Sequence, residues 1–337
     1  MGRQLQTRAT YRSERGDSGK RYGGYYMGEG QLHVNTTERV AVFQDGEQLT
    51  LLRPEFNIET PTNSPAPAEM SVRIAPSLIG LSLLERIPDA RLETLEDPKD
   101  ANRDGVSGRI HWRTDTAGEP APGRFGWKAS HVSVASQTAV AFAEDIGITN
   151  PMERKQNCSE QQLDCLAQRH GADATEGVEV PGLLFDKVVF FTGNMAPPPA
   201  GALTPKVRLG QRMFSRAGCD SCHTPSHTLT VENADGESSS ETIWPYTDLL
   251  LHDMGELLAD SMHDGLAASG EWRTSPLWGL GLSLTVNETT GLLHDGRART
   301  VAEAVAWHGG EGQDARDRFF DLNEKQRAAL EAFVLAL

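Results

Sequence analysis

The sequence predicts a mainly α fold in two parts, with long loops throughout and one small β-hairpin in the first part. Residues 194–205 are rich in proline, which ends any helix and marks the boundary. Helical patterns with start signals dominate the part that follows. The 337 residues include 33 Gly and 18 Pro with 38% hydrophobic residues, which is typical of a folded, loop-rich protein. We therefore expect domains at 1–193 and 194–337.

The first part is predicted to combine coil, a hairpin and short helices. Residues 1–38 show no clear period, so we expect extended coil there. Two β-prone runs flank Asp45 and Gly46 within residues 39–53, which is a hairpin signal. Helices are expected at residues 77–88, 89–97, 132–146 and 180–192.

The second part begins with a helix that leads into a cysteine motif. Pro205 stands at a helix-initiating position, and the pattern that follows places Leu209, Met213 and Phe214 on one side. Two capping boxes predict further helices near the end of the chain, at Thr300 with Glu303 and at Asn323 with Gln326.

The charge of the chain limits its partners. A net charge of −15 argues against nucleic acid, because phosphate binding needs clustered Lys and Arg. The longest apolar stretches are too short and too interrupted to span a bilayer. The first twenty residues have no apolar core or cleavage site, so they do not form a secretory signal.

The peptide Cys219-Asp-Ser-Cys222-His223 carries the strongest chemical signal in the sequence. In a C-x-x-C-H peptide two thiols can reach the vinyl groups of one haem, while the adjacent imidazole binds the iron. A redox dithiol would follow a strand in a βαβ pattern, which is absent here. A zinc site would need a second ligand pair at close spacing. We therefore predict one covalently bound haem c.

Cys158 and Cys165 are the remaining cysteines. Haem c is usually attached outside the cytoplasm, where thiols oxidise, so a small disulfide loop is expected. Two separate structural thiols are the alternative.

A second iron ligand should come from His or Met after the motif. The candidates are His227, His252, Met254, Met262, His263, His294 and His308. His308 falls at the helical interval from Val301 and Val305, on one apolar face. Two glycines follow it and would allow close approach to a flat ring. We predict His308 as the ligand, with a hydrogen-bonded core histidine as the alternative and Met254 as the second choice.

The stretch HDGRARTVAEAV resembles the C-terminal haem domain of bacterial di-haem cytochrome c peroxidases and of relatives that modify other proteins. His294 and His308 lie 14 positions apart, similar to the separation between a His-Asp/Asn-Gly motif and the distal ligand in those proteins. The resemblance implies a cytochrome c-like second domain and a bis-histidine haem through His223 and His308.

A broader resemblance covers nearly the whole chain. The motifs RIAPSLIGLSLLERIP, DGVSGR, GRFGWKAS, YTDLLLHDMGE, EWRTSPLWGLG, LLHDGRA and WHGGE resemble the di-haem oxidoreductase family of peroxidases, often labelled thiol oxidoreductases. Such relatives are expected to carry a signal and a second C-x-x-C-H ahead of the segment next to Met1, and neither is found here. In related proteins peroxide reacts at that first haem, so a bis-His iron alone would only pass electrons.

A loop with closely spaced carboxylates could bind calcium. Asp100, Asn102 and Asp104, followed by Gly105, resemble the start of a D-x-N-x-D-G calcium loop. Counted from Asp100, the twelfth position of the loop is His111, where an EF-hand has a bidentate Glu. An Asx-rich turn is therefore the alternative.

Several aromatic and basic residues are expected near the haem. Trp127 could relay electrons between redox centres, although most buried tryptophans are core anchors. The residues predicted to wall the haem pocket are Trp244, Trp272, Trp278 and Trp307. Arg297 and Arg299 are predicted to pair with the haem propionates.

The sequence thus predicts a periplasmic c-type haem oxidoreductase whose redox partner is a small cytochrome or a cupredoxin. A peroxidase-like enzyme acting through a second haem is the first hypothesis for its full-length form. A pure electron-transfer module is the alternative, and a thiol-dependent enzyme using a free dithiol is a third.

Overall fold

The computed structural model describes residues 5–10, 31–59, 69–158, 166–168, 171–172, 175–232, 235, 238–286 and 291–337. Its strands are β1 (Leu5–Thr10), β2 (Gln31–Val42), β3 (Gln48–Glu59), β4 (Glu69–Ile74), β5 (Trp112–Thr114), β6 (Pro120–Pro122), β7 (His227–Glu232), β8 (Ser238–Ile243), β9 (Leu251–Asp253) and β10 (Glu271–Arg273). Its helices are α1 (Leu81–Glu85), α2 (Asp89–Leu95), α3 (Val134–Val140) continued by the π-helix η1 (Ala141–Asp145), α5 (Gly182–Gly193), α6 (Pro205–Ala217), α7 (Leu280–Val286), α8 (Val301–Trp307), α9 (Gln313–Phe320) and α10 (Glu324–Val334), with short 3-10 turns η2 (Cys219–Ser221) and η3 (Gly310–Gly312).

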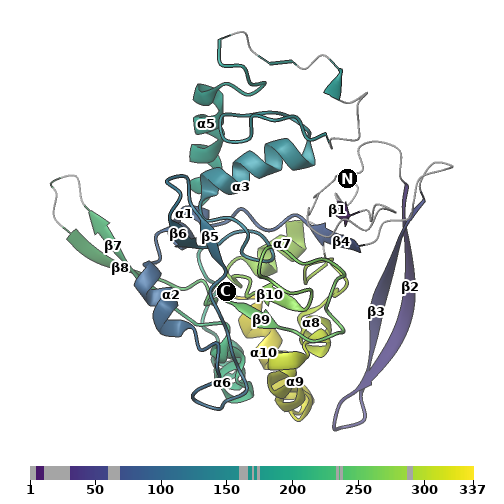
Figure 1. The fold of residues 1–337 in the computed structure, drawn as a ribbon. Coiled ribbons are helices and arrows are strands. Elements are labelled where there is room, and N and C mark those ends of the chain that lie inside the picture. The colour runs from purple at the N-terminus through teal and green to yellow at the C-terminus, as the bar shows by residue number, and fades with distance from the viewer. Residues whose placement is uncertain are drawn as a thin grey trace.

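The prediction of a mainly α fold is wrong. Five two-stranded antiparallel sheets accompany the helices: β1–β4, β2–β3, β5–β6, β7–β8 and β9–β10. The strand β7 alternates buried Leu229 with exposed Thr228 and Thr230, a period of two that identifies a strand. Long loops join these pieces, so the fold mixes helix, strand and loop (Figure 1).

The predicted hairpin forms but is longer than residues 39–53. β2 and β3 each run for 12 residues and pair from Val42↔Gln48 to Gln31↔Glu59. The turn includes Gly46 at φ +86°, a conformation that favours glycine. The expected coil over residues 1–38 is therefore wrong in part, because β1 and most of β2 lie there. Buried Phe43 and Leu51 anchor the hairpin to the core.

The expected helices are present, with shifted ends. The segment 132–146 forms α3 and η1, and 180–192 forms α5. Asn323 and Gln326 form the complete capping box at the start of α10. At α8 the Thr300 side chain accepts from the Glu303 amide, but the Glu303 carboxylate bonds to Arg299. No helix among the described residues is long and apolar enough to cross a membrane.

The helices α6 and α10 cross closely and fix the start of the cysteine motif. A Cβ added at Gly210 on α6 would lie 1.9 Å from the carbonyl oxygen of Ala329 on α10, so only glycine permits this contact. Phe214, Tyr246 and Phe333 pack edge to face, with ring centroids 5.4–5.9 Å apart. This cluster holds the end of α6 in place.

The chain segments before and after the predicted domain boundary at residue 194 share one hydrophobic core. One buried cluster combines Leu84 and Phe125 from the first part with Leu229 and Leu250 from the second. Phe125 and Leu250 are each no more than 3% exposed. The division into two domains stays a prediction.

Candidate functional site

The cysteine motif lies where α6 ends, as predicted. Gly218 ends the helix at φ +81°, and the turn η2 then carries Cys219 to Ser221. The amide of His223 donates to the carbonyl oxygen of Cys219 at 3.0 Å, which closes the motif on itself. Both thiols are free and half-buried.

The two thiols are not poised for redox chemistry as a dithiol. Burial raises the pKa of Cys219 to about 12, and burial also raises the pKa of Cys222 even though His252 opposes that effect. A reactive dithiol needs a lowered pKa, because the thiolate is the nucleophile. Both pKa shifts therefore run against the thiol-dependent alternative.

His223 is held as a neutral imidazole with one nitrogen free. Its Nδ1 lies 3.0 Å from the carbonyl oxygen of Tyr246 and donates to it in the Nδ1–H tautomer. Burial lowers the pKa of His223 to about 4. Such a hydrogen bond orients an axial histidine and leaves Nε2 as the nitrogen that can bind iron.

His308 has a similar hydrogen bond to the backbone. Its Nδ1 lies 2.7 Å from the carbonyl oxygen of Ala304, and burial lowers its pKa. A charge on His308 would lower the pKa of His223 further. The predicted helix through His308 is one residue too long, because α8 ends at Trp307 and His308 is its extended C-cap.

His252 is excluded as a ligand by its own hydrogen bonds. Its Nε2 lies 2.8 Å from Asp248 Oδ2 and its Nδ1 lies 2.7 Å from Glu311 Oε2. Burial disfavours the charged ring, but the charges and hydrogen bonds of Asp248 and Cys222 together hold the pKa of His252 well above 6.5. A protonated imidazole has no lone pair for iron.

Glu311 forms hydrogen bonds that connect three of the sequence motifs. This role of Glu311 was not predicted from the sequence. Its carboxylate accepts from the Ser107 amide and hydroxyl, both at 2.9 Å, and from the Asp253 amide at 3.1 Å. It also bonds to His252, whose Nδ1 is 3.6 Å from the Cys222 sulfur. The only sequence signal was the presence of these residues inside the motifs DGVSGR, HDMGE and WHGGE.

The other histidine and methionine candidates lie in different settings. The Nε2 of His227 bonds to the Thr247 carbonyl at 2.7 Å. His294 stacks on Trp272 with ring centroids 3.8 Å apart. The methyl group of Met254 and the His308 ring both border Gly312, so Met254 is the methionine beside the predicted ligand.

The guanidinium of Arg297 packs on the ring of Trp307, which is the last residue of α8. The Arg297 guanidinium lies 4.8 Å from the Trp307 ring, bonds to Asp295 and donates to the Leu257 carbonyl. Trp307 is fully buried, and its Nε1 has no hydrogen-bond partner among the described residues. Arg299 is bonded to Glu303 and to the Thr50 carbonyl. Their predicted contacts with a haem stay predictions.

The remaining tryptophans differ in burial, and their predicted place around a haem stays a prediction. Trp272 and Trp278 are buried, whereas Trp244 is 58% exposed and does not form a dry wall. Trp127 donates to the Ile74 carbonyl at 2.7 Å and lies edge-on to His294.

The loop with Asp100, Asn102 and Asp104 forms an Asx-rich turn. Asp100 Oδ1 and Asn102 Oδ1 both accept from the Asp104 amide at 2.9 Å. Asp100 adopts φ +46°. Among the described residues no group of three or more His, Cys, Asp or Glu could hold a metal ion. Calcium at this loop stays a prediction.

The predicted disulfide between Cys158 and Cys165 is not tested, because Cys165 lies outside the described residues.

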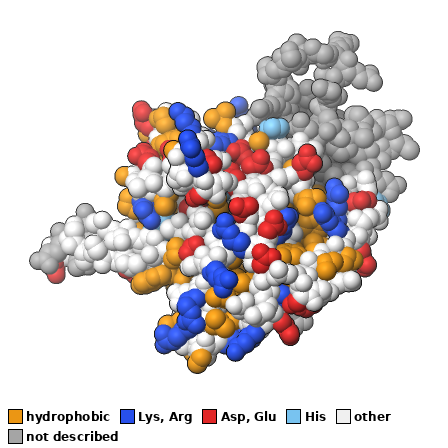
Figure 2. All heavy atoms as spheres, turned by 90° about the horizontal axis from the view of Figure 1, so that it is seen from below, with side chains coloured by type: hydrophobic (Ala, Val, Ile, Leu, Met, Phe, Trp, Pro, Cys, Tyr) orange, Lys and Arg blue, Asp and Glu red, His pale blue; other side chains and the backbone are white. Residues whose placement is uncertain are grey.

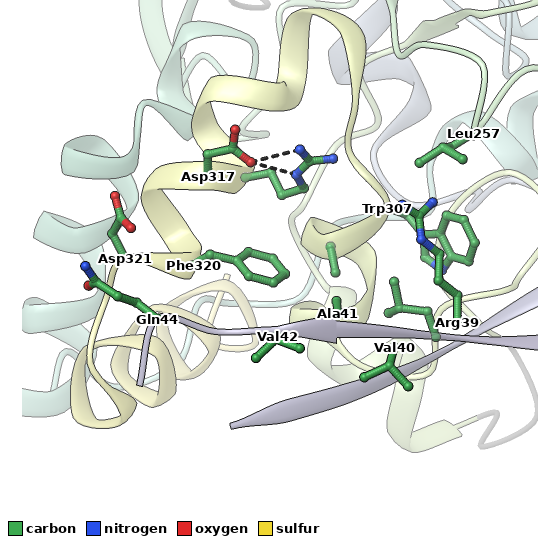
Figure 3. A pocket seen from close by; sticks show the side chains of 13 residues that line it. Arg39, Val40, Ala41, Val42, Gln44, Leu257, Trp307, Asp317, Phe320 and Asp321 are labelled. Carbon is green, nitrogen blue, oxygen red and sulfur yellow. Dashed lines mark hydrogen bonds and ion pairs between the residues drawn. The ribbon is translucent and has the colours of Figure 1, made fainter. Parts of the chain in front are cut away.

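A pocket of about 500 Å³ lies between β2 and the helices α8 and α9. Figure 3 shows Asp321 and Gln44 at one end and Arg39 with Trp307 at the other. The pocket borders the site, because Arg316 in its wall donates to the His308 carbonyl oxygen at 3.0 Å and pairs with Asp317.

These residues fit a covalently attached haem. Two free thiols stand beside the imidazole of His223, and His308 offers a second imidazole; each ring has its Nδ1 bonded to a backbone carbonyl and a pKa lowered by burial. The chemistry of this donor set matches thioether attachment with two nitrogen ligands.

Comparisons with known proteins identify the family of the chain. No curated protein sequence matches the chain. A chain from the solved structure "Kuenenia stuttgartiensis Hydrazine Synthase Pressurized with 20 bar Xenon" matches at 14% identity, covers 79% of this chain and 73% of that chain, and has a TM-score of 0.32, too low to carry an argument. The family described as "Di-haem oxidoreductase, putative peroxidase" matches residues 18–337, so this chain belongs to the di-haem oxidoreductase family.

Proposed function

We propose that this chain is a c-type haem oxidoreductase that transfers electrons through one covalently bound haem. Cys219 and Cys222 would hold the haem by thioether bonds, and His223 and His308 would bind the iron. The observation that carries the proposal is the pair of imidazoles, His223 in the motif and His308 after α8, each with Nδ1 bonded to a backbone carbonyl and each with a pKa lowered by burial. Family membership supports haem oxidoreductase chemistry in general.

The protein would hold the two imidazoles neutral at physiological pH. Burial lowers the pKa of each, so neither ring needs to lose a proton before it binds a metal. The backbone bonds to Tyr246 and Ala304 fix the ring orientations. A haem in this position supplies a one-electron iron couple.

Two histidine ligands favour electron transfer over substrate chemistry at this centre. If His223 and His308 both held the iron, no ligand position would be left for peroxide, and reaction with peroxide would need a second haem, which the di-haem family name implies. The alternative function is a pure electron-transfer module without its own catalytic haem. A C-x-x-C-H motif encoded upstream of this sequence would favour the peroxidase-like enzyme.

The helix α6 suggests how a redox partner would approach. It carries Lys206, Arg208, Arg212 and Arg216 and no acidic residue, although the whole chain has a net charge of −15. Figure 2 shows Lys and Arg side chains interspersed with acidic and apolar ones on the face seen from below. We propose a small cytochrome or a cupredoxin as the partner, and a periplasmic location because haem c and disulfides form outside the cytoplasm. Calcium at Asp100 and Asp104 and a Cys158–Cys165 disulfide belong to the same proposal.

The substitution His308→Ala tests the ligand assignment. The oxidised wild-type protein should be low-spin, without the weak sulfur-to-iron band of a methionine ligand. His308→Ala should open the site and give a high-spin spectrum that changes on addition of cyanide. The measurement is electronic absorption together with electron paramagnetic resonance at one pH.

Met254→Ala is the matched control, because its methyl group borders the same glycine as the His308 ring. It should leave the low-spin spectrum nearly unchanged. A low-spin His308→Ala protein together with a high-spin Met254→Ala protein would transfer the ligand role to Met254.

A further inference from the structure

Residues 245–250 run beside the cysteine motif as one buried segment, which we call the strap. All six residues are buried, although the segment is neither helix nor strand. Buried backbone outside regular structure needs hydrogen-bond partners from other parts of the chain. The hairpin of β7 and β8 extends from the body of the molecule, and the pair His227↔Ile243 at its base returns the chain to the motif (Figure 1).

The peptide group between Tyr246 and Thr247 orients the proposed iron ligand. Its carbonyl oxygen accepts from Nδ1 of His223 at 3.0 Å. Its amide donates to the carbonyl oxygen of Thr224 at 3.0 Å. Because a peptide group is planar, its oxygen and its N–H point in opposite directions and turn together. The direction of the bond to His223 is therefore fixed by the contacts that prevent this plane from turning.

The backbone of the strap is strained, so it needs bonds to hold its shape. Tyr246 adopts φ +54° and Leu249 adopts φ +63°, left-handed conformations that are rare for bulky side chains. Such conformations persist only where the surrounding structure imposes them. Without those bonds the strap would relax, and the Tyr246 carbonyl oxygen would turn away from His223.

The next peptide group, between Thr247 and Asp248, is held in the same way. Its carbonyl oxygen accepts from Nε2 of His227 at 2.7 Å, and its amide donates to the carbonyl oxygen of Cys222 at 3.1 Å. His227 is 2% exposed, and burial lowers its pKa, so the ring is neutral with its proton on Nε2. Among the residues that the structure describes, Nδ1 of His227 has no hydrogen-bond partner. Thr247 is fully buried, so water cannot replace the His227 donor.

We propose that His227 is a positioning residue for His223 and acts through the strap. By holding the Thr247 carbonyl it stops the preceding peptide plane from turning, which keeps the Tyr246 oxygen aimed at Nδ1 of His223. The two histidines lie four positions apart, and each donates to one of two consecutive peptide groups. A hydrogen bond at Nδ1 makes an imidazole a stronger iron ligand, so His227 would lower the reduction potential of the centre. The inference rests on the proposed role of His223 as an iron ligand.

Three substitutions at position 227 test the inference on the haem-loaded protein. His227→Phe keeps a ring but removes the donor, His227→Gln places an amide N–H near the position of Nε2, and His227→Asn is too short to do so. The Phe and Asn variants should raise the reduction potential and change the g values of the low-spin ferric signal. They should also speed hydrogen exchange at Nδ1 of His223 by at least about tenfold, because a buried carbonyl loses its donor. His227→Gln should restore the wild-type values. Nuclear magnetic resonance of the reduced protein measures the exchange.

His111→Phe is the matched control, because it removes a bond of the same kind outside the strap. His111 is 1% exposed, and its Nδ1 lies 2.7 Å from the carbonyl oxygen of Lys128. The variant should leave the potential, the g values and the exchange at His223 unchanged. Changes as large as those of His227→Phe would indicate a general loss of packing and would overturn the inference.

Two further results would also overturn it. One is a His227→Phe protein with the potential, the g values and the exchange rate of the wild type. The other is a Gln variant that differs from the wild type as much as the Asn variant does, and this comparison decides even if the Phe variant does not fold. Both results leave the iron ligands as proposed. A wild-type protein without a low-spin haem would instead contradict the proposed function, and with it the inference.

Discussion

At the scale of single residues, the site depends on histidines whose charge is decided by their surroundings. His252 is buried, yet its ring bonds to the carboxylates of Asp248 and Glu311, and Asp248 together with Cys222 raises its pKa well above 6.5. His223 and His308 face backbone carbonyls instead, so burial decides and both stay neutral. Identical side chains thus have different roles because of their hydrogen-bond partners.

His294 should make the folded state sensitive to acid. The ring is 6% exposed and stacks on Trp272, and burial lowers its pKa to about 3, although Asp295 opposes the shift. The unfolded chain therefore binds one more proton than the native state between pH 6.5 and pH 3. The stability that this residue contributes is present above pH 6.5 and is lost as the pH falls through that range.

The substitution His294→Phe isolates this effect, because Phe keeps an aromatic ring against Trp272 and cannot titrate. Between about pH 7.5 and about pH 5 the free energy of unfolding should fall by about 2 kcal/mol more in the wild type than in the variant. Urea unfolding at several pH values measures the difference, with His263→Phe as the control at an exposed histidine. Parallel curves for the wild type and His294→Phe would show that His294 does not titrate as a buried group.

At the scale of elements, the contact between the end of α8 and β9 positions the second ligand. Gly310 adopts φ +51°, and a Cβ there would lie 2.1 Å from the Asp253 carbonyl oxygen. The backbone following His308 thus rests directly on the end of β9, which carries His252. Only glycine satisfies both the left-handed conformation and the close approach.

The substitution Gly310→Ala should therefore destabilise the protein by at least about 2 kcal/mol and disturb the low-spin spectrum, because α8 must move to relieve the contact. Gly118→Ala is the matched control, since Gly118 has φ +89° but nothing within 4 Å of an added Cβ. It should cost only about 1 kcal/mol and leave the spectrum intact. Equal losses in the two variants would mean that the approach to Asp253 does not constrain α8. Denaturant unfolding and absorption spectra measure both effects.

At the scale of the whole molecule, local patterns predicted local structure well and long-range structure poorly. The helix α6, the hairpin turn at Gly46 and the capping box at Asn323 follow from contacts within a few residues, so the sequence indicates them. The pairing of β1 with β4 and of β9 with β10 joins segments that are distant in the sequence. No local pattern of apolar and polar residues predicts this pairing.

The candidate site divides in the same way. Cys219, Cys222 and His223 are recognisable because one covalent reaction requires their fixed spacing. The role of Glu311 is not recognisable, because its partners Ser107 and His252 lie 204 and 59 positions away along the chain. Sequence spacing therefore predicts where a cofactor would attach. It does not predict the hydrogen bonds that orient the residues around that place.

The central claim is that this chain holds one haem covalently through Cys219 and Cys222. The mass of the denatured polypeptide tests it most directly, on protein produced in a host that attaches haem c. The mass should equal the polypeptide plus one haem, and Cys219→Ser or Cys222→Ser should each lose stable stoichiometric attachment. A wild-type protein with the bare polypeptide mass, or a serine variant that keeps a haem bound by two thioether bonds, would contradict the account.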